Sequence, residues 1–175
     1  MSADLLAEQH RHLARLLEAI QRCAWFLHES EAKIDWPIEA GWLGKHKKDV
    51  ELFETLAAIN ERFAKLQDTL ASAMRHSALL MGEPTDSFLK VLAFFEKQGV
   101  IDTMGDWQRC RTVRNMAAHD YATDYGEIAE HFNLLHQLSD MLYRCARRLL
   151  ELCDTLLDIR PASDDFTEEF NRLFA

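Results

Sequence analysis

The chain of 175 residues is 48% hydrophobic and 28% charged, a composition typical of a compact globular domain, which excludes a largely disordered chain. Its six glycines and three prolines are too few for the many turns of a β-rich protein, so we expect long helices. The formal net charge of −9 argues against nucleic-acid binding over the whole surface but is compatible with a small basic site.

No apolar run reaches the roughly 18 to 20 residues of a membrane span, and the first residues do not resemble a secretory leader. We therefore expect no membrane segment and a cytoplasmic location. The four cysteines form no CxxC pair, so free buried thiols are expected rather than disulfides or a zinc site. No histidine pair with metal-ligand spacing and no glycine-rich phosphate loop is recognisable, so neither a metal nor a cofactor is predicted.

Residues 4 to about 30 carry leucines and other apolar side chains at helical spacing. The pattern then fails around Trp36, Pro37, Gly41 and Gly44, which indicates a loop. We assign residues 1–46 to an N-terminal helical extension and its loop.

Residues 52–73 have the clearest pattern, because their apolar side chains alternate spacings of four and three, as in the seam of a helix packed at a shallow angle. A helix is predicted from about 47 to 81, ended by the turn residues 82–84, and a shorter helix is predicted to begin at Thr85 or Asp86 and to end at Gly99. Short connections predict antiparallel neighbours. The seam residues are Leu52, Leu56, Ile59, Phe63, Leu66, Leu70 and Ala73.

Asp102 or Thr103 is expected to begin the next helix, and residues 121–125 are expected to interrupt the pattern. A second long helix is predicted over 124–159, because apolar residues recur every seven positions in two series, and a tail helix is predicted over 164–174. The sequence therefore predicts an all-α fold: an up-and-down antiparallel helical bundle at 47–160, the N-terminal extension, and an acidic tail helix within 161–175. The two series are Ile128, Leu135, Leu142, Leu149 and Leu156, and Leu138, Cys145 and Leu152.

Residues 107–121 contain a polar cluster that a simple helical bundle does not need. Three arginines fall within six residues, and a histidine and a tyrosine follow. A histidine can act as general acid or base near neutral pH, while a guanidinium stabilises negative charge on phosphoryl oxygens. These groups are sufficient to cleave RNA without a metal ion, because the ribose 2′-hydroxyl is a built-in nucleophile.

The spacing of Arg114 and His119 alone is weak evidence for a catalytic pair, because Arg22 and His28 provide a second pair of the same kind. Residues five apart differ by about 140° around an α-helix, so Arg114 and His119 would not share a face of one continuous helix. Asn115 and His119, four apart, would share a face, and Asn115 could therefore orient His119. Arg114 could meet a histidine either because the helix ends nearby or because two protomers face each other across a twofold axis.

The run at 114–121, Arg-Asn-Met-Ala-Ala-His-Asp-Tyr, resembles the Arg-x4-His-x-Tyr signature of HEPN-domain proteins. It is most similar to the HepT-like toxins and the related nucleotidyltransferase-associated HEPN proteins, and the resemblance extends over about residues 48–158. It implies a homodimer with its cleft between protomers. It also implies a metal-independent endoribonuclease that cleaves RNA by 2′-hydroxyl attack, leaving 2′,3′-cyclic phosphate ends, with a minimal nucleotidyltransferase as antitoxin.

The resemblance also implies roles for individual residues. Arg114 and His119 would be the catalytic pair, with Asn115 and Asp120 as supporting polar residues. Tyr121 would be the residue that the antitoxin adenylylates. The added AMP would place bulk and a negative phosphate beside the cleft and so repel RNA.

Other interpretations stay open at this level. Arg109 and Arg111 could contact RNA phosphates or could pair with Asp102 or Asp106 on a solvated face, and Trp107 is expected in the core. The alternative function is a noncatalytic HEPN module that binds a nucleotidyltransferase or its substrate. A purely structural helical adaptor is a third possibility.

Overall fold

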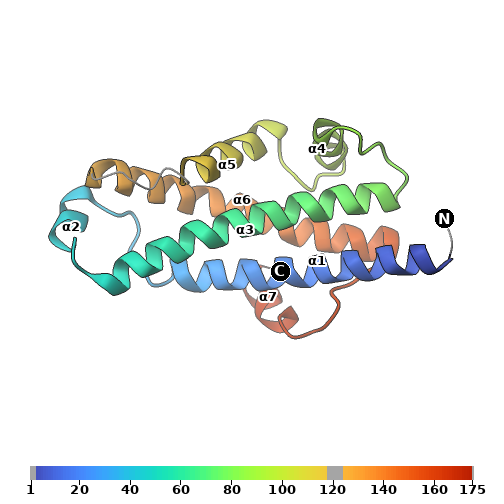
Figure 1. Ribbon diagram of the computed structural model, residues 1–175, viewed down its shortest axis with the longest axis horizontal. Helices are drawn as coiled ribbons and strands as arrows, with labels where there is room; N and C mark the ends of the chain where they lie inside the picture. The colour runs from blue at the N-terminus through green and yellow to red at the C-terminus, as the bar shows by residue number, and fades with distance from the viewer. Residues whose placement is uncertain (1–2, 118–123, 175) are drawn as a thin grey trace.

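The computed structural model describes residues 3–117 and 124–174, which form an all-α structure (Figure 1). This described part contains seven helices and no strand, so the predicted fold class is confirmed. None of its helices is both long enough and apolar enough to cross a membrane. The helices are α1 (Ala3–Glu31), α2 (Ala40–Lys45), α3 (Val50–Leu80), α4 (Phe88–Lys97), α5 (Met104–Ala117), α6 (Tyr125–Leu157) and α7 (Thr167–Phe174).

Four of these helices form the body of the molecule. In Figure 1, α1 runs from right to left, α3 returns to the right, α5 runs to the left again, and α6 returns to the right. Each of these four helices therefore runs antiparallel to the next one of the four, although α1 and α3 are joined through α2, and α3 and α5 through α4. The long helices α1, α3 and α6 pack against each other, and α5 lies against both α3 and α6. The arrangement is an up-and-down bundle in which α5 is the short member.

The core of the bundle is built on α3. All seven residues of the predicted α3 seam are buried, and Ile59, Phe63 and Leu66 have no exposed surface. Helix α1 contributes Leu13 and Leu17, likewise without exposed surface, to the same core. The N-terminal extension is thus held by shared apolar packing, whereas the division of the chain at residues 46 and 160 stays a prediction.

The two heptad series on α6 are buried through most of the helix. Leu135, Leu142 and Leu149 have no exposed surface, but Leu156 is 54% exposed, so the prediction that it belongs to the seam is wrong. A straight α-helix has 3.6 residues per turn and drifts by about 20° per heptad, so a seven-residue series turns away from the core after a few repeats. The helix ends one residue later, at Leu157.

The loop predicted between residues 31 and 48 contains the short helix α2. Glycine disfavours a helix, which is why Gly41 and Gly44 indicated a loop. Leu43 between them is fully buried, and α2 packs against the start of α6. Burial of this side chain therefore outweighs the local propensity. The chain before α2 is fixed to α6 by Asn133, whose side chain accepts a hydrogen bond from the Ile38 N–H at 2.7 Å and donates to the Ile38 carbonyl at 2.9 Å.

Helix α4 begins later than predicted. Its first flanking residue is Ser87 rather than Thr85 or Asp86, and Asp86 instead accepts a hydrogen bond from Lys90 at 2.8 Å. The predicted stop signals are confirmed, because Gly82 follows α3 with φ 76° and Gly99 follows α4 with φ 73°. Such positive φ angles favour glycine.

A buried polar cluster joins α1 to α6. The carboxylate of Glu31 is 5% exposed and accepts hydrogen bonds from the Tyr143 hydroxyl at 2.6 Å and from His136 Nδ1 at 3.0 Å. The ring of Trp36 stacks on His136 at 4.2 Å. Burial, together with the adjacent Glu31 carboxylate, raises the pKa of Tyr143 well above its usual range, so the phenol stays a hydrogen-bond donor. The Trp36 Nε1–H also donates to the Glu31 backbone carbonyl at 2.9 Å, so Glu31 is held by three side chains, as expected of a structural network.

The predicted free thiols are confirmed, because all four cysteines are unpaired and three are buried. Burial raises the pKa of the Cys110, Cys145 and Cys153 thiols to about 12. They stay protonated at neutral pH, and a protonated thiol is a poor nucleophile.

Candidate functional site

Helix α5 carries the arginine cluster on its solvent side. Thr103 begins the helix, as predicted: its hydroxyl accepts a hydrogen bond from the Asp106 N–H at 3.0 Å and donates to the Asp106 carboxylate at 2.9 Å. Trp107, Cys110 and Val113 recur every three residues and are buried, with Trp107 only 2% exposed. The expectation that Trp107 belongs to the core is confirmed, whereas Arg109 and Arg111, which lie between these positions, are exposed.

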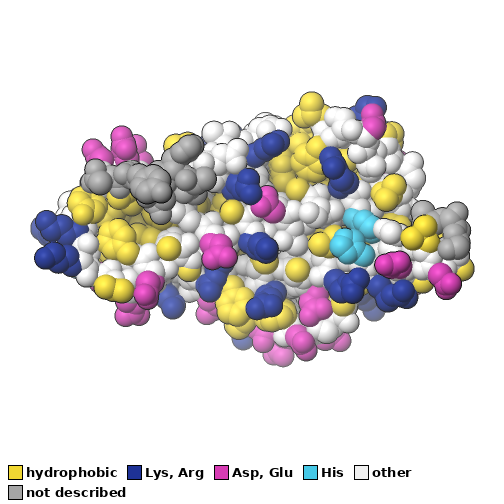
Figure 2. All heavy atoms as spheres, in the orientation of Figure 1, with side chains coloured by type: hydrophobic (Ala, Val, Ile, Leu, Met, Phe, Trp, Pro, Cys, Tyr) yellow, Lys and Arg dark blue, Asp and Glu magenta, His cyan; other side chains and the backbone are white. Residues whose placement is uncertain are grey.

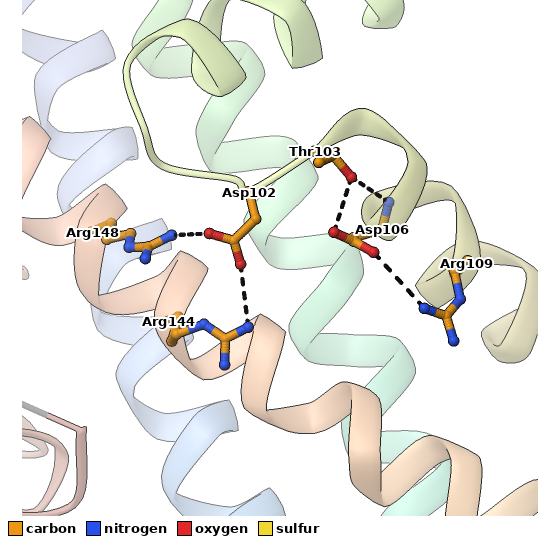
Figure 3. Close-up of polar contacts among 6 residues, drawn as sticks. All are labelled: Asp102, Thr103, Asp106, Arg109, Arg144 and Arg148. Carbon is orange, nitrogen blue, oxygen red and sulfur yellow. Dashed lines mark hydrogen bonds and ion pairs between the residues drawn. The ribbon is translucent and has the colours of Figure 1, made fainter.

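Asp102, just before α5, is bound by arginines of α6 rather than by those of α5. Arg148 donates to its carboxylate at 2.7 Å and Arg144 at 3.2 Å (Figure 3). The hydrogen bond from Arg148, assisted by the one from Arg144, holds the pKa of Asp102 below its usual value. This pair of contacts fixes the start of α5 to α6.

Arg109 and Arg111 lie in different surroundings. Arg109 Nη1 is 3.8 Å from the Asp106 carboxylate, one turn earlier on the same helix (Figure 3), and its side chain is 64% exposed. This is one of the two expected partners. Arg111 is exposed and borders a surface pocket, and it makes no ion pair with any other described residue. Of these two arginines, only Arg111 borders that pocket.

Arg114 is held at the surface by a carboxylate from another helix. Its Nη2 donates to Asp68 of α3 at 2.7 Å, and its Nη1 donates to the Asn115 side-chain oxygen at 3.2 Å. The Arg114 side chain is 36% exposed, and Asn115 is exposed. Two predicted site residues are therefore in contact, and Asp68 fixes the direction in which the guanidinium points.

His119, Asp120 and Tyr121 lie outside the described residues, so their predicted roles stay predictions. The described chain leaves α5 at Ala117 and resumes at Asp124. There the Asp124 carboxylate accepts hydrogen bonds from the N–H groups of Gly126 and Glu127 at 2.7 and 3.2 Å and so caps α6.

A pocket of about 320 Å³ opens beside Arg114, where α3, α4 and α5 meet. Figure 2 shows a hydrophobic patch above α3, between α4 and α5, with basic side chains on both sides of it. Apolar side chains form part of its wall, and its charged groups come from α3 and α5. The apolar residues are Ala71, Phe88 and Trp107, and the charged residues are Asp68, Arg75, Arg111 and Arg114.

Asp68 and Arg75 were not identified from the sequence as site residues. They are seven apart on α3, and Ala71 and Ser72 between them complete an i, i+3, i+4, i+7 stripe that lines the pocket. Arg111 on α5 continues a similar stripe, being four residues after Trp107 and three before Arg114. The residues of both stripes recur at helical spacing, and this spacing is the signal in the sequence that predicts each stripe on one face of its helix.

Comparisons with known proteins do not add to these observations. No protein-family model matches the chain, and searches of curated proteins and of solved structures found no match. The resemblance to HEPN proteins therefore rests on the residues of the motif at 114–121. Within residues 3–116 and 124–174, no group of three or more His, Cys, Asp or Glu side chains could hold a metal ion.

Proposed function

We propose that this protein is a HEPN-type, metal-independent endoribonuclease and the toxin of a pair with a minimal nucleotidyltransferase antitoxin. The observation that carries the proposal is the position of Arg114. It lies near the end of α5 with over a third of its side chain exposed, and it is oriented by Asp68 and Asn115 beside a basic pocket. A guanidinium so placed is accessible to a phosphodiester.

In this proposal, His119 acts as general base and removes the proton from the ribose 2′-hydroxyl. The 2′-oxygen then attacks the adjacent phosphorus, and the bond from phosphorus to the 5′-oxygen breaks. A protonated histidine, His119 of a second copy, donates a proton to that 5′-oxygen. The products are a 2′,3′-cyclic phosphate and a 5′-hydroxyl, and no metal or cofactor is consumed.

Arg114 stabilises the negative charge that builds on the phosphoryl oxygens during this step. The ion pair with Asp68 leaves this role open, because a guanidinium has five N–H donors and the contacts with Asp68 and Asn115 use two of them. Asp68 would hold the remaining donors in one orientation. Such a preorganised donor stabilises a transition state without being rearranged during the reaction.

The proposed cleft is shared by two copies of the chain. Met116, next to Asn115, is 55% exposed, which gives this end of α5 an apolar side chain that a second copy could cover. A twofold arrangement would place two copies of Arg114 and of His119 in one cleft. The antitoxin would silence the cleft by adenylylating Tyr121, which adds a negative phosphate where RNA must approach.

A noncatalytic module that binds a nucleotidyltransferase or its substrate is the second candidate. It is favoured by the ion pair of Arg114, which is already neutralised within its own chain at 2.7 Å, and by the net charge of −9. Such a module would bind its partner without cleaving RNA.

The test is incubation of the purified protein with end-labelled RNA in excess EDTA, compared with the His119→Ala and His10→Ala variants. His10 is a half-buried histidine of α1, outside the motif at 114–121, and serves as the control. We expect cleavage by the wild type and by His10→Ala, with 2′,3′-cyclic phosphate ends, and none by His119→Ala. Intact RNA with all three proteins, each folded and with Tyr121 unmodified, would exclude the nuclease and favour the binding module.

A further inference from the structure

The pocket between α3, α4 and α5 contains more positive than negative charge, in a protein whose net charge is −9. Arg75, Arg111 and Arg114 border it, whereas Asp68 is the single acidic residue among its lining residues. Asp68 is occupied by Arg114 at 2.7 Å. Among the described residues, neither Arg75 nor Arg111 makes an ion pair, so two positive charges are left without a carboxylate. A surplus of this kind favours an anionic ligand.

Across the pocket from Arg111 and Arg114, the lining residues include the guanidinium of Arg75 on α3 and the aromatic ring of Phe88 at the start of α4. The Arg75 guanidinium lies 5.6 Å from the centre of the Phe88 ring, and the Trp107 ring lies 6.3 Å from that of Phe88. Planar guanidinium groups and aromatic rings are the surfaces on which unpaired nucleobases stack. The Ser72 hydroxyl and the Asp68 carboxylate, also at the pocket, can accept hydrogen bonds from a base edge.

We propose that this pocket binds a nucleotide. Its phosphate lies against Arg111 and Arg114, which are three residues apart and therefore neighbours on α5, and its base stacks against Arg75 and Phe88. The volume of about 320 Å³ is at the small end of the range of roughly 300 to 1,000 Å³ found for ligand pockets, which suits a single nucleotide.

The nucleotide that fits this pocket has two sources with the same chemistry: it is either one nucleotide within an RNA chain or a free mononucleotide. The inference rests on the proposed function for the first source only. In that case the pocket would hold the nucleotide next to the phosphodiester at Arg114 and so position the substrate.

The experiment measures binding in EDTA, so that it does not depend on cleavage. The probes are 5′-AMP, inorganic phosphate and a short 2′-O-methyl oligoribonucleotide, which lacks the 2′-hydroxyl nucleophile. The variants are Arg75→Ala and Phe88→Leu. The matched control is Arg22→Ala, because Arg22 is likewise exposed and lies over the ring of Phe26 at 5.8 Å, away from the pocket.

We expect Arg75→Ala to weaken binding of AMP or of the oligonucleotide by about tenfold, and Arg22→Ala to change it less than twofold. Phe88→Leu should weaken nucleotide binding several-fold while leaving phosphate binding unchanged. An effect on the oligonucleotide would identify RNA as the source, and an effect on AMP alone would identify a free nucleotide. Equal affinity of wild type and Arg75→Ala for both, or equal affinity of wild type for phosphate and AMP, would overturn the proposal.

The two proposals can fail separately. A wild-type protein that binds the oligonucleotide through Arg75 but leaves RNA uncut in the cleavage assay would refute the nuclease and keep the nucleotide pocket. A nuclease whose kcat and KM are both unchanged by Arg75→Ala would keep the proposed function and refute the pocket as a subsite for RNA.

Discussion

Two clusters of arginine and carboxylate lie at α5, one just before its first residue and one along the helix, and they differ in how many arginines are left without a carboxylate. Asp102 is bound by Arg148 and Arg144, which come from one helix and close on a single carboxylate (Figure 3). In the pocket, the one carboxylate, Asp68, pairs with Arg114 and leaves Arg75 and Arg111 unpaired among the described residues. The first cluster joins the start of α5 to α6. The second joins α5 to α3 and also presents, beside the Phe88 ring, two arginines without an ion pair to any described residue. Residue type alone does not distinguish these roles.

The largest expected effect comes from Trp107, which lies under the pocket and anchors α5 in the core. Trp107→Ala should lower the free energy of unfolding by about 3 to 5 kcal/mol, because it removes a large buried side chain and leaves a cavity. Urea denaturation measures this change. Trp42→Ala is the matched control, because Trp42 is 41% exposed, and it should cost less than about 1 kcal/mol. Equal losses in the two variants would contradict the assignment of Trp107 to the core.

The next largest expected effect is on oligonucleotide binding, and it compares an arginine without an ion pair among the described residues, Arg111, with one that has an ion pair, Arg109. Arg111→Ala should weaken binding of a 2′-O-methyl oligoribonucleotide by about tenfold and lower the slope of its salt dependence by about one. Arg109→Ala removes the same charge from the same helix, but Arg109 is paired with Asp106 and does not line the pocket, so we expect less than a twofold change. Titrations at several salt concentrations measure both. Similar losses of oligonucleotide affinity in the two variants would show that binding depends on the overall charge of the protein and not on the position of Arg111 at the pocket.

The smallest expected effect is a pH-dependent change in stability when the ion pairs of Asp102 are removed. The folded-state pKa of Asp102 is depressed, so its ion pairs stabilise the protein above the ordinary aspartate pKa of about 3.9, and this stability is lost as pH falls through the folded-state pKa. Because the Asp102 side chain is 40% exposed, we expect Asp102→Asn to cost at most about 1 kcal/mol at pH 7, and less as the pH falls below about 3.9.

Denaturation of both proteins at several pH values provides the measurement for Asp102. The control is Asp86→Asn, which removes the exposed pair between Asp86 and Lys90 and should change stability less. A stability difference between wild type and Asp102→Asn that does not shrink as the pH falls below about 3.9 would contradict the role given to this carboxylate.

The long helices could be predicted from the sequence because their stability depends on apolar spacing. The seam of α3 was predicted residue by residue. The ends of α3 and α4 were predicted from Gly82 and Gly99, because the positive φ angles that follow these helices favour glycine. The same reasoning missed α2, because burial of Leu43 is a tertiary effect that outweighs the local cost of two glycines. It also assigned Leu156 to the core, because a seven-residue repeat does not match 3.6 residues per turn over a helix of 33 residues.

The candidate site could be predicted only in part. Arg111 and Arg114 stood out because charged residues cluster in one short stretch, and clustering along the chain is visible in a sequence. Asp68 and Arg75 did not stand out, because they are more than 30 residues away and reach the site through the packing of α3 against α5. Their partners are set by three-dimensional contacts, which periodicity within a single helix does not specify.

The most direct test of the account compares Arg114→Ala with Arg147→Ala in the EDTA cleavage assay. The two arginines are closely matched: their side chains are 36% and 34% exposed, and each has one ion pair, with Asp68 and with Glu151 respectively. The account predicts that Arg114→Ala cleaves RNA at least about 100-fold more slowly than wild type, while Arg147→Ala cleaves normally. Equal rates for Arg114→Ala and Arg147→Ala would contradict the central claim that Arg114 stabilises the reacting phosphate.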